Sequence, residues 1–336
     1  MTRLKNLVLG GLTAIAIGGA ASSAFALEPG SFDNRLNGAT IGLPLGALPP
    51  PGLYTGLETA YLGWPGSGAG NRGAGTYFAG VANAVPLLYV PGWNFLGATY
   101  AMSVVVAFYE VQVLGGSPFR ANPGVLGAVD VFANPTWSPI TLSWNLGGGW
   151  FIASGFDFMA PIAPVAQISS TNPDYWTFEV PLNIAYINAS WTLAANDFFD
   201  FNTASKGVCC LGAGVGGSSV PGNGYRGGAI YYGDYTAVYK FGKWSIGPVG
   251  FVEAQLSNDQ PGGGVACTFG PGGLCGHYLN VGLGGLVGYN FGPVDLQFWV
   301  TQSVLRHDAI DGLDFWTRLG FRLWAPEAPK PLVAKN

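Results

Sequence analysis

Charged residues are scarce in this chain. Only 10% of its 336 residues are charged, while 49% are hydrophobic, and a soluble domain usually carries about 25% charged residues. The ordinary solvated surface of a globular protein is therefore missing. The net charge of −4 also argues against a nucleic-acid partner, because surfaces that bind DNA or RNA are strongly basic.

The mature region also lacks a clear transmembrane helix. Its best candidate, the uncharged run 73–109, is interrupted by Pro86 and Pro91 as well as by glycines. Within it, larger side chains occupy every second position from Tyr100 to Phe108, and this period of two favours a strand over a helix.

The N-terminus reads as an export signal. Arg3 and Lys5 precede the apolar core Leu7–Ala20, and Ala24–Ala26 provides a small-x-small cleavage site. The apolar core is shorter than the roughly 20 residues of a membrane-spanning helix. We expect residues 1–26 to be a signal peptide and the mature protein to lie outside the cytoplasmic membrane.

The clearest structural signal is a pair of alternating segments, 225–241 and 244–257. In the first, tyrosines, alanines and Phe241 share one face, whereas Asp234, Thr236 and Lys240 share the other. Successive side chains of a strand point to opposite faces. Each segment is longer than the usual ~5–6 residues of a globular strand and suits the ~9–11 tilted residues that cross a bilayer. This pattern indicates one hairpin of a transmembrane β-barrel.

The same pattern predicts an all-β fold, an antiparallel transmembrane β-barrel of about twelve strands. Short connections near Gly92, Ser138, Ala189, Gly242 and Gly292 alternate with longer ones, which is how outer-membrane barrels are laid out, so both termini should be periplasmic. The predicted strands are 52–62, 73–90, 97–111, 125–136, 140–159, 174–188, 190–202, 225–241, 244–258, 277–290, 293–306 and 311–324.

Tryptophan marks one end of these strands. Trp93, Trp137, Trp191 and Trp244 lie at or beside the predicted short turns, and Trp324 closes the last strand. A row of indoles at one level is typical of an interfacial aromatic girdle.

The chain therefore divides into four parts. Residues 1–26 are the signal peptide, 27–50 a lead-in without alternation that either lies in the lumen or outside it, 51–324 the barrel, and 325–336 a periplasmic tail.

Several segments resemble a known family. LPPPGLY at 48–54, DYWTFEVPLNIAYIN at 174–188 with DFNT at 200–203, the block that starts at Tyr225, and DFWTRLGFRLW at 314–324 are similar to outer-membrane proteins of the meta-pathway of phenol degradation family. The resemblance covers most of residues 48–324. It implies an outer-membrane transporter for small hydrophobic compounds linked to aromatic catabolism.

Polar residues on the inward faces are the candidate site. Acids and bases are mixed, which suits pairing across a plugged or narrow lumen, while apolar inward positions favour hydrophobic cargo. The candidates are Glu179, Asp200, Tyr232, Asp234, Lys240, Glu253, Asp295, Asp314, Trp316, Arg318 and Arg322.

The four cysteines fall in two long outward loops. An oxidising compartment permits disulfides, and two arrangements fit: Cys267 with Cys275 within one loop, or two bridges that join these residues to Cys209 and Cys210.

Other chemistry is weakly supported. The two histidines, His277 and His307, lie at outer strand ends; Ser303 is four residues from His307 and so about 13 Å away along a strand. The GxGxxG matches at 68–73 and 212–217 lack the βαβ context of a dinucleotide site. We therefore predict no cofactor, no metal site and no catalytic residue.

The resulting hypothesis is a passive outer-membrane channel for small hydrophobic, including aromatic, compounds. Its partners would be membrane lipid, its cargo and the outer-membrane assembly machinery. Two alternatives stay open: a barrel hydrolase acting on lipids, and a structural or adhesive barrel without a pore.

Overall fold

The computed structural model describes residues 34–64, 76–115, 124–162, 175–204, 226–260, 277–307 and 312–327. All of the regular structure in these ranges is β-strand. None of the described segments forms a helix long and apolar enough to span a membrane.

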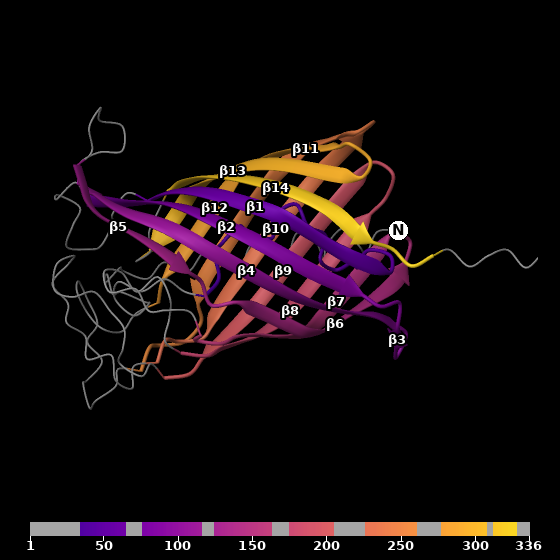
Figure 1. Cartoon of the computed structure of the whole chain (residues 1–336), viewed down its shortest axis with the longest axis horizontal. Helices are drawn as coiled ribbons and strands as arrows, with labels where there is room; N and C mark the ends of the chain where they lie inside the picture. Colours follow the sequence, from indigo (N-terminus) through magenta and orange to yellow (C-terminus); the bar gives the residue numbers. More distant parts are fainter. Residues whose placement is uncertain are drawn as a thin grey trace, which may run out of the picture.

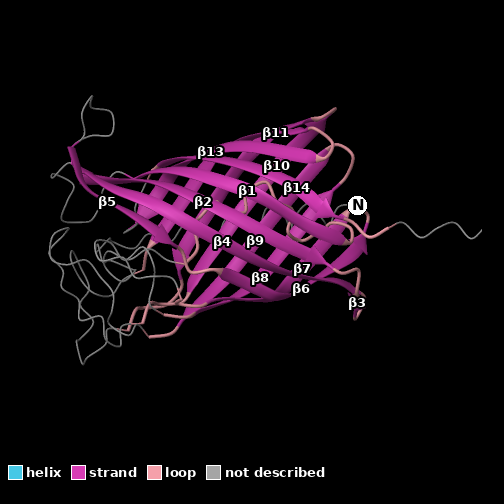
Figure 2. Cartoon of the chain, viewed as in Figure 1, coloured by secondary structure: helices cyan, strands magenta, loops and turns pink. Residues whose placement is uncertain are grey.

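The strands close into a twelve-stranded antiparallel barrel, as the sequence predicts. Each barrel strand pairs with the barrel strand that follows it in the chain. The first strand pairs with the last, and Leu57 lies opposite Leu319. Figure 1 shows β1 lying between β2 and β14, and Figure 2 shows the tilt of the strands around the wall. The barrel strands are β1 Gly52–Trp64, β2 Thr76–Val90, β4 Ala98–Gly115, β6 Thr136–Gly147, β7 Trp150–Met159, β8 Thr177–Ile187, β9 Trp191–Asn202, β10 Ile230–Phe241, β11 Trp244–Gln255, β12 Leu279–Asn290, β13 Val294–His307 and β14 Leu313–Trp324.

Two short elements add to this wall. β3, Asn94–Phe95, pairs with the start of β4. β5, Gly124–Phe132, pairs with the far half of β4, while β6 pairs with the near half. β5 and β6 therefore lie one after the other along the same edge of β4, and residues 133–135 separate them. Among the described strands, β5 has no partner on its other edge.

The prediction of strands 125–136 and 140–159 with a turn near Ser138 is wrong. Ser138 lies inside β6, and the short turn falls at Gly148–Gly149, between β6 and β7. Ser138-Pro139 resembles a turn in the sequence because proline lacks a backbone donor, but in the structure it is an irregularity in the pairing of β6 with β7. Glycines 147–149 all have positive φ, which the tight reversal requires.

The girdle assignment changes with that turn. Trp137 pairs with Phe158, far from the short turn, and Trp150 occupies the girdle position instead. Trp93, Trp191, Trp244 and Trp324 do lie at the end with the short turns, and all four are exposed. This end therefore carries a row of tryptophans at the level of the membrane–water interface.

Outward and inward faces alternate as expected for a barrel in lipid. On β14, Phe315, Leu319 and Phe321 are exposed, whereas Asp314, Trp316 and Arg318 are buried. Because arginine on the lipid face would cost roughly 2–4 kcal/mol at mid-bilayer, this register can hardly reverse.

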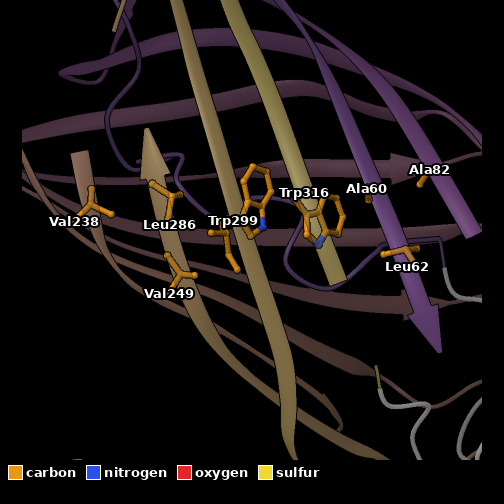
Figure 3. Packing of buried hydrophobic residues seen from close by; sticks show 9 residues of the cluster. Ala60, Leu62, Ala82, Val238, Val249, Leu286, Trp299 and Trp316 are labelled. Atoms are coloured by element: carbon orange, nitrogen blue, oxygen red, sulfur yellow. The ribbon is translucent and has the colours of Figure 1, made fainter. Parts of the chain in front are cut away.

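Part of the interior is apolar. Trp299 and Trp316 stack with ring centroids 5.4 Å apart and planes 8° apart. They lie beside Leu286, Val249 and Val238 in the cluster drawn in Figure 3. Ile41, which precedes the barrel in the chain, is completely buried in the same cluster. A segment outside the wall therefore lies within the lumen.

Candidate functional site: a lumenal segment and the residues that hold it

Residues 34–50, hereafter the lumenal segment, follow a chain of tight turns rather than a strand or helix. Leu43 N donates to Thr40 O at 3.1 Å and Ala47 N to Pro44 O at 2.9 Å. Gly42 has a φ of +83°, and a Cβ there would lie 2.5 Å from the Gln297 side chain. Glycine is needed at this position for both its backbone conformation and its close approach to the wall.

Asp234 on β10 binds the backbone of this segment through both carboxylate oxygens. Its Oδ1 accepts from Gly38 N at 2.8 Å, and its Oδ2 accepts from Thr40 N at 2.8 Å and Thr40 Oγ1 at 2.7 Å. One turn further on, Gly42 N donates to Thr236 Oγ1 at 2.8 Å. Hydrogen bonds to a charged acceptor are among the stronger ones in proteins.

Arg318 on β14 binds carbonyl groups of the same segment, whereas Asp234 binds its amides. Its Nη1 donates to Ile41 O at 2.6 Å and its Nη2 to Ala39 O at 2.5 Å. Its Nε donates to Glu58 Oε2 on β1 at 2.7 Å, and the guanidinium lies over the Trp299 ring, 4.6 Å from its centroid. One buried side chain thus joins the segment to the first and last strands.

Neutral side chains of the wall donate hydrogen bonds to other carbonyl groups of the lumenal segment. Asn196 Nδ2 donates to Thr40 O at 3.0 Å and to Leu43 O at 2.8 Å. Ser143 Oγ donates to Gly46 O at 2.7 Å, and Gln297 Nε2 to Gly42 O at 3.2 Å. Main-chain groups between Gly38 and Gly46 are therefore paired with wall side chains, as buried backbone groups require.

A second charged contact lies at the other end of the segment. Arg35 Nε and Nη2 each lie 2.5 Å from a Glu179 oxygen, and its guanidinium covers the Phe198 ring at 3.6 Å. Glu179 is opposite Asp157 on β7 and Asp200 on β9, and all three carboxyl side chains are buried. Burial alone would lower the pKa of Arg35, but Glu179, Asp200 and Asp157 raise it above its usual value. Arg35 therefore remains a cation.

The structure gathers only some of the predicted site residues. Asp314 is buried further along β14, and five others are buried near one another or against the segment: Glu179, Asp200, Asp234, Trp316 and Arg318. Tyr232 is buried in a second cluster with Phe198 and Tyr278, against which Leu45 of the segment packs, and Glu253 accepts a hydrogen bond from Tyr278.

The remaining predicted residues lie away from the segment. Asp295 is exposed at the short-turn end, where Asn290 Nδ2 donates to it at 2.5 Å. Arg322 is exposed, and Lys240 is half-buried near the end of β10. These three do not form part of the cluster that holds the segment.

Several contributing residues were not found from the sequence. Glu58 and Asn196 share the inward register of Ala60 and Asp200, so extending the alternation would have identified them. Arg35 and Thr40 carry no periodic signal, because they precede the first strand. The carbonyl groups that Arg318 binds cannot be predicted from the sequence, because every residue has one.

The other sequence candidates add no second site among the described residues. His277 Nε2 lies 2.5 Å from Asn258 Oδ1 rather than next to a serine. No group of three or more potential metal ligands occurs in the described ranges. Cys209, Cys210, Cys267, Cys275 and both GxGxxG matches lie outside the described residues.

A closed antiparallel barrel with an apolar outer band and interfacial indoles is an integral protein of the bacterial outer membrane. The family described as "Putative MetA-pathway of phenol degradation" matches residues 64–319, and the chain belongs to this family. No curated protein matches the chain in sequence.

Solved structures resemble the fold. The COG4313 outer membrane channel from Pseudomonas putida F1 is 11% identical with a TM-score of 0.64, covering 82% of this chain and 96% of that one. The CymD monoaromatic hydrocarbon channel is 10% identical with a TM-score of 0.39, covering 90% and 97%. A TodX monoaromatic hydrocarbon channel variant is 11% identical with a TM-score of 0.40, covering 90% and 96%. At this identity the similarity of the first structure concerns the fold, and the other two are only broadly alike.

Proposed function

We propose that this protein is a passive outer-membrane channel for small hydrophobic compounds, aromatic ones included. The observation that carries the proposal is the apolar part of the lumen, where Trp299 and Trp316 stack beside Leu286 and Val249. A general porin has a polar, water-filled interior. A lumen with aromatic and aliphatic walls lowers the free energy of transfer of apolar cargo from water. It does not lower the free energy of transfer of ions or sugars.

The lumenal segment acts as the gate in this proposal. It is held by side-chain hydrogen bonds and by the ion pair between Arg35 and Glu179, not by pairing with a strand. Such a segment can leave without opening the backbone ladder that closes the wall. Among the strands that the structure describes, the free edge of β5 interrupts the wall, which also supports a sideways exit for apolar cargo.

The family description supports aromatic cargo, since it refers to phenol degradation. We assign no catalytic step to the chain. A hydrolase would need a nucleophile beside a histidine, whereas the contact of His277 is Asn258. Insertion into the membrane would use the outer-membrane assembly machinery, as for other barrels.

An uptake assay tests the proposal. Cells lacking the protein are compared with cells that express wild-type or Trp299→Ala protein, using radiolabelled toluene, phenol, decane and, as a polar control, glucose. We expect wild type to accelerate only the apolar compounds and Trp299→Ala to change their ratio, while Trp93→Ala, a girdle substitution, should behave as wild type. Equal uptake with and without the protein for every compound would refute the channel.

Hydrolysis provides the complementary measurement. Purified protein should release no fatty acid from phospholipid vesicles above the rate of the vesicles alone. Turnover that disappears in His277→Ala would favour the enzyme instead.

A further inference from the structure

Asp197 is a carboxyl group on the lipid-facing side of the wall. In β9 the inward side chains are Thr192, Ala194 and Asn196, all buried, so the odd-numbered neighbours Leu193, Ala195 and Asp197 point outward. Asn196 contacts the lumenal segment, which fixes this register. Asp197 lies six positions from the girdle residue Trp191. At ~3.3 Å per residue and a tilt near 40°, this is about 15 Å into an apolar band ~25 Å tall.

A carboxyl group at that depth is costly and usually functional. Its partners are two tyrosines of β10: Tyr231 hydroxyl donates to Asp197 Oδ1 at 2.6 Å, and Tyr235 hydroxyl is 3.4 Å from the same oxygen. The two hydroxyl oxygens lie 2.5 Å apart. Within the described residues, Oδ2 receives no hydrogen bond from a side chain or backbone group. One acceptor atom therefore remains for a donor from outside the protein.

The arrangement depends on a glycine. Gly233 is directly opposite Asp197 in the β9–β10 pairing. A Cβ at Gly233 would lie 2.5 Å from the Tyr231 hydroxyl and 2.6 Å from the Tyr235 hydroxyl. Both rings fold over the space that the missing side chain leaves. Any larger residue would push the hydroxyl groups away from Asp197.

An apolar hollow on the outer wall includes Tyr235 in its lining and reaches the girdle residue Trp150. It has a volume of about 530 Å³, and its lining also includes Leu193, Ala195, Ala237, Pro248 and Gly250. Small-molecule sites are commonly hollows of ~300–1,000 Å³ with a few polar groups that fix orientation. Tyr235 belongs both to the hollow and to the hydrogen-bonded group around Asp197.

We propose that this outer-wall hollow binds a small apolar molecule bearing one hydroxyl group, taken from the membrane phase. The hydrocarbon part lies over Ala195, Ala237 and Gly250, and the hydroxyl group joins the hydrogen bonds of Tyr235 and Asp197. The apolar lining favours a hydrocarbon body, and the acceptor oxygen selects a donor. The site is separated from the lumen by the wall, so the proposal does not rest on the channel function.

The test is a ¹⁹F NMR titration of full-length protein in lipid nanodiscs, with 4-fluorophenol as probe and fluorobenzene as the analogue without a hydroxyl group. Empty nanodiscs give the baseline for partition into lipid. We expect 4-fluorophenol to show a saturable component that Asp197→Leu weakens by about tenfold or more, the usual worth of a hydrogen bond to a charged group. Fluorobenzene should bind equally weakly to both proteins.

Two further variants separate binding from folding. Gly233→Ala keeps the carboxyl group but displaces both hydroxyls, and should weaken the same component. Asn83→Leu removes another lipid-facing polar contact, the 2.8 Å hydrogen bond from Thr59, and should leave binding unchanged. Heat-modifiable migration on gels confirms that each variant is folded.

Three outcomes would overturn the proposal. The first is a titration no different from empty nanodiscs, and the second is equal affinity in wild type and Asp197→Leu. The third is a wild-type dimer in native mass spectrometry that Asp197→Leu converts to monomer, which would make the hollow a surface for a second copy of this chain.

Discussion

Replacing Arg318 with alanine should open the lumen without unfolding the wall. The substitution removes the hydrogen bonds to Ile41 O and Ala39 O and the 2.6 Å ion pair with Glu58. Glu58 remains in the wall with a side chain only 11% exposed. Removing one partner of a buried ion pair typically costs about 3–5 kcal/mol, because the remaining charge lacks both partner and water.

That cost acts mainly on the docked state of the lumenal segment. When the segment leaves, water reaches Glu58 and the penalty is relieved, so the substitution favours departure. At ~1.4 kcal/mol per tenfold change, the docked-to-undocked ratio should fall by about 10²–10⁴-fold. The barrel keeps its closed ladder of backbone hydrogen bonds and should stay folded.

Planar-bilayer conductance measures the effect, and heat-modifiable migration on gels reports the folded barrel. We expect a larger and more frequent open level for Arg318→Ala. Arg322→Ala removes an exposed arginine from the same face of β14 and should match wild type. The double variant Arg318→Leu/Glu58→Leu removes the stranded charge and should move conductance back toward wild type. Unchanged conductance of folded Arg318→Ala, or loss of the folded barrel, would contradict this reasoning.

Other predictions concern topology, disulfides and the second ion pair. Cysteines introduced at Ser117 and Ser218, which lie in two long connections outside the described residues, should react with a membrane-impermeant maleimide on intact cells. A cysteine at Ala189, in a short turn, should not react; its labelling would invert the orientation. Mass spectrometry of non-reduced protein should find at least one disulfide among Cys209, Cys210, Cys267 and Cys275, and four free thiols would contradict it. Arg35→Met should lower the midpoint of thermal unfolding by circular dichroism, since it leaves Glu179 beside Asp157 and Asp200 without a cation; an unchanged midpoint would show that this pair contributes little.

The alternation of side chains predicts the wall well because one physical constraint governs it. In lipid a charged side chain on the outward face is costly, so Phe315, Leu319 and Arg318 could be assigned to faces from the sequence alone. The same reasoning fails where the ladder is interrupted. At Ser138-Pro139 the pattern is equally compatible with a turn and with an irregularity inside one strand, and only the pairing with β4 and β7 distinguishes them.

The interior was less predictable than the wall. Strand periodicity indicates that Asp234 points inward, but not that its partners are the amides of Gly38 and Thr40. Those groups belong to a stretch without periodicity, and main-chain donors and acceptors are the same in every residue. Asp197 could not be predicted from the sequence for a different reason. A strong strand pattern tolerates one polar residue, and the tyrosine partners of Asp197 lie on another strand.

The placement of Arg318 couples the closure of the wall to the contents of the lumen. β1 and β14 form the seam between the first and last strands, and Arg318 contacts Glu58 across that seam while its other nitrogens bind the carbonyl groups of Ala39 and Ile41. The lumenal segment directly precedes β1, so the same arginine contacts the seam of the wall and the segment inside it. The stability of the seam and the retention of the segment are therefore linked through one side chain.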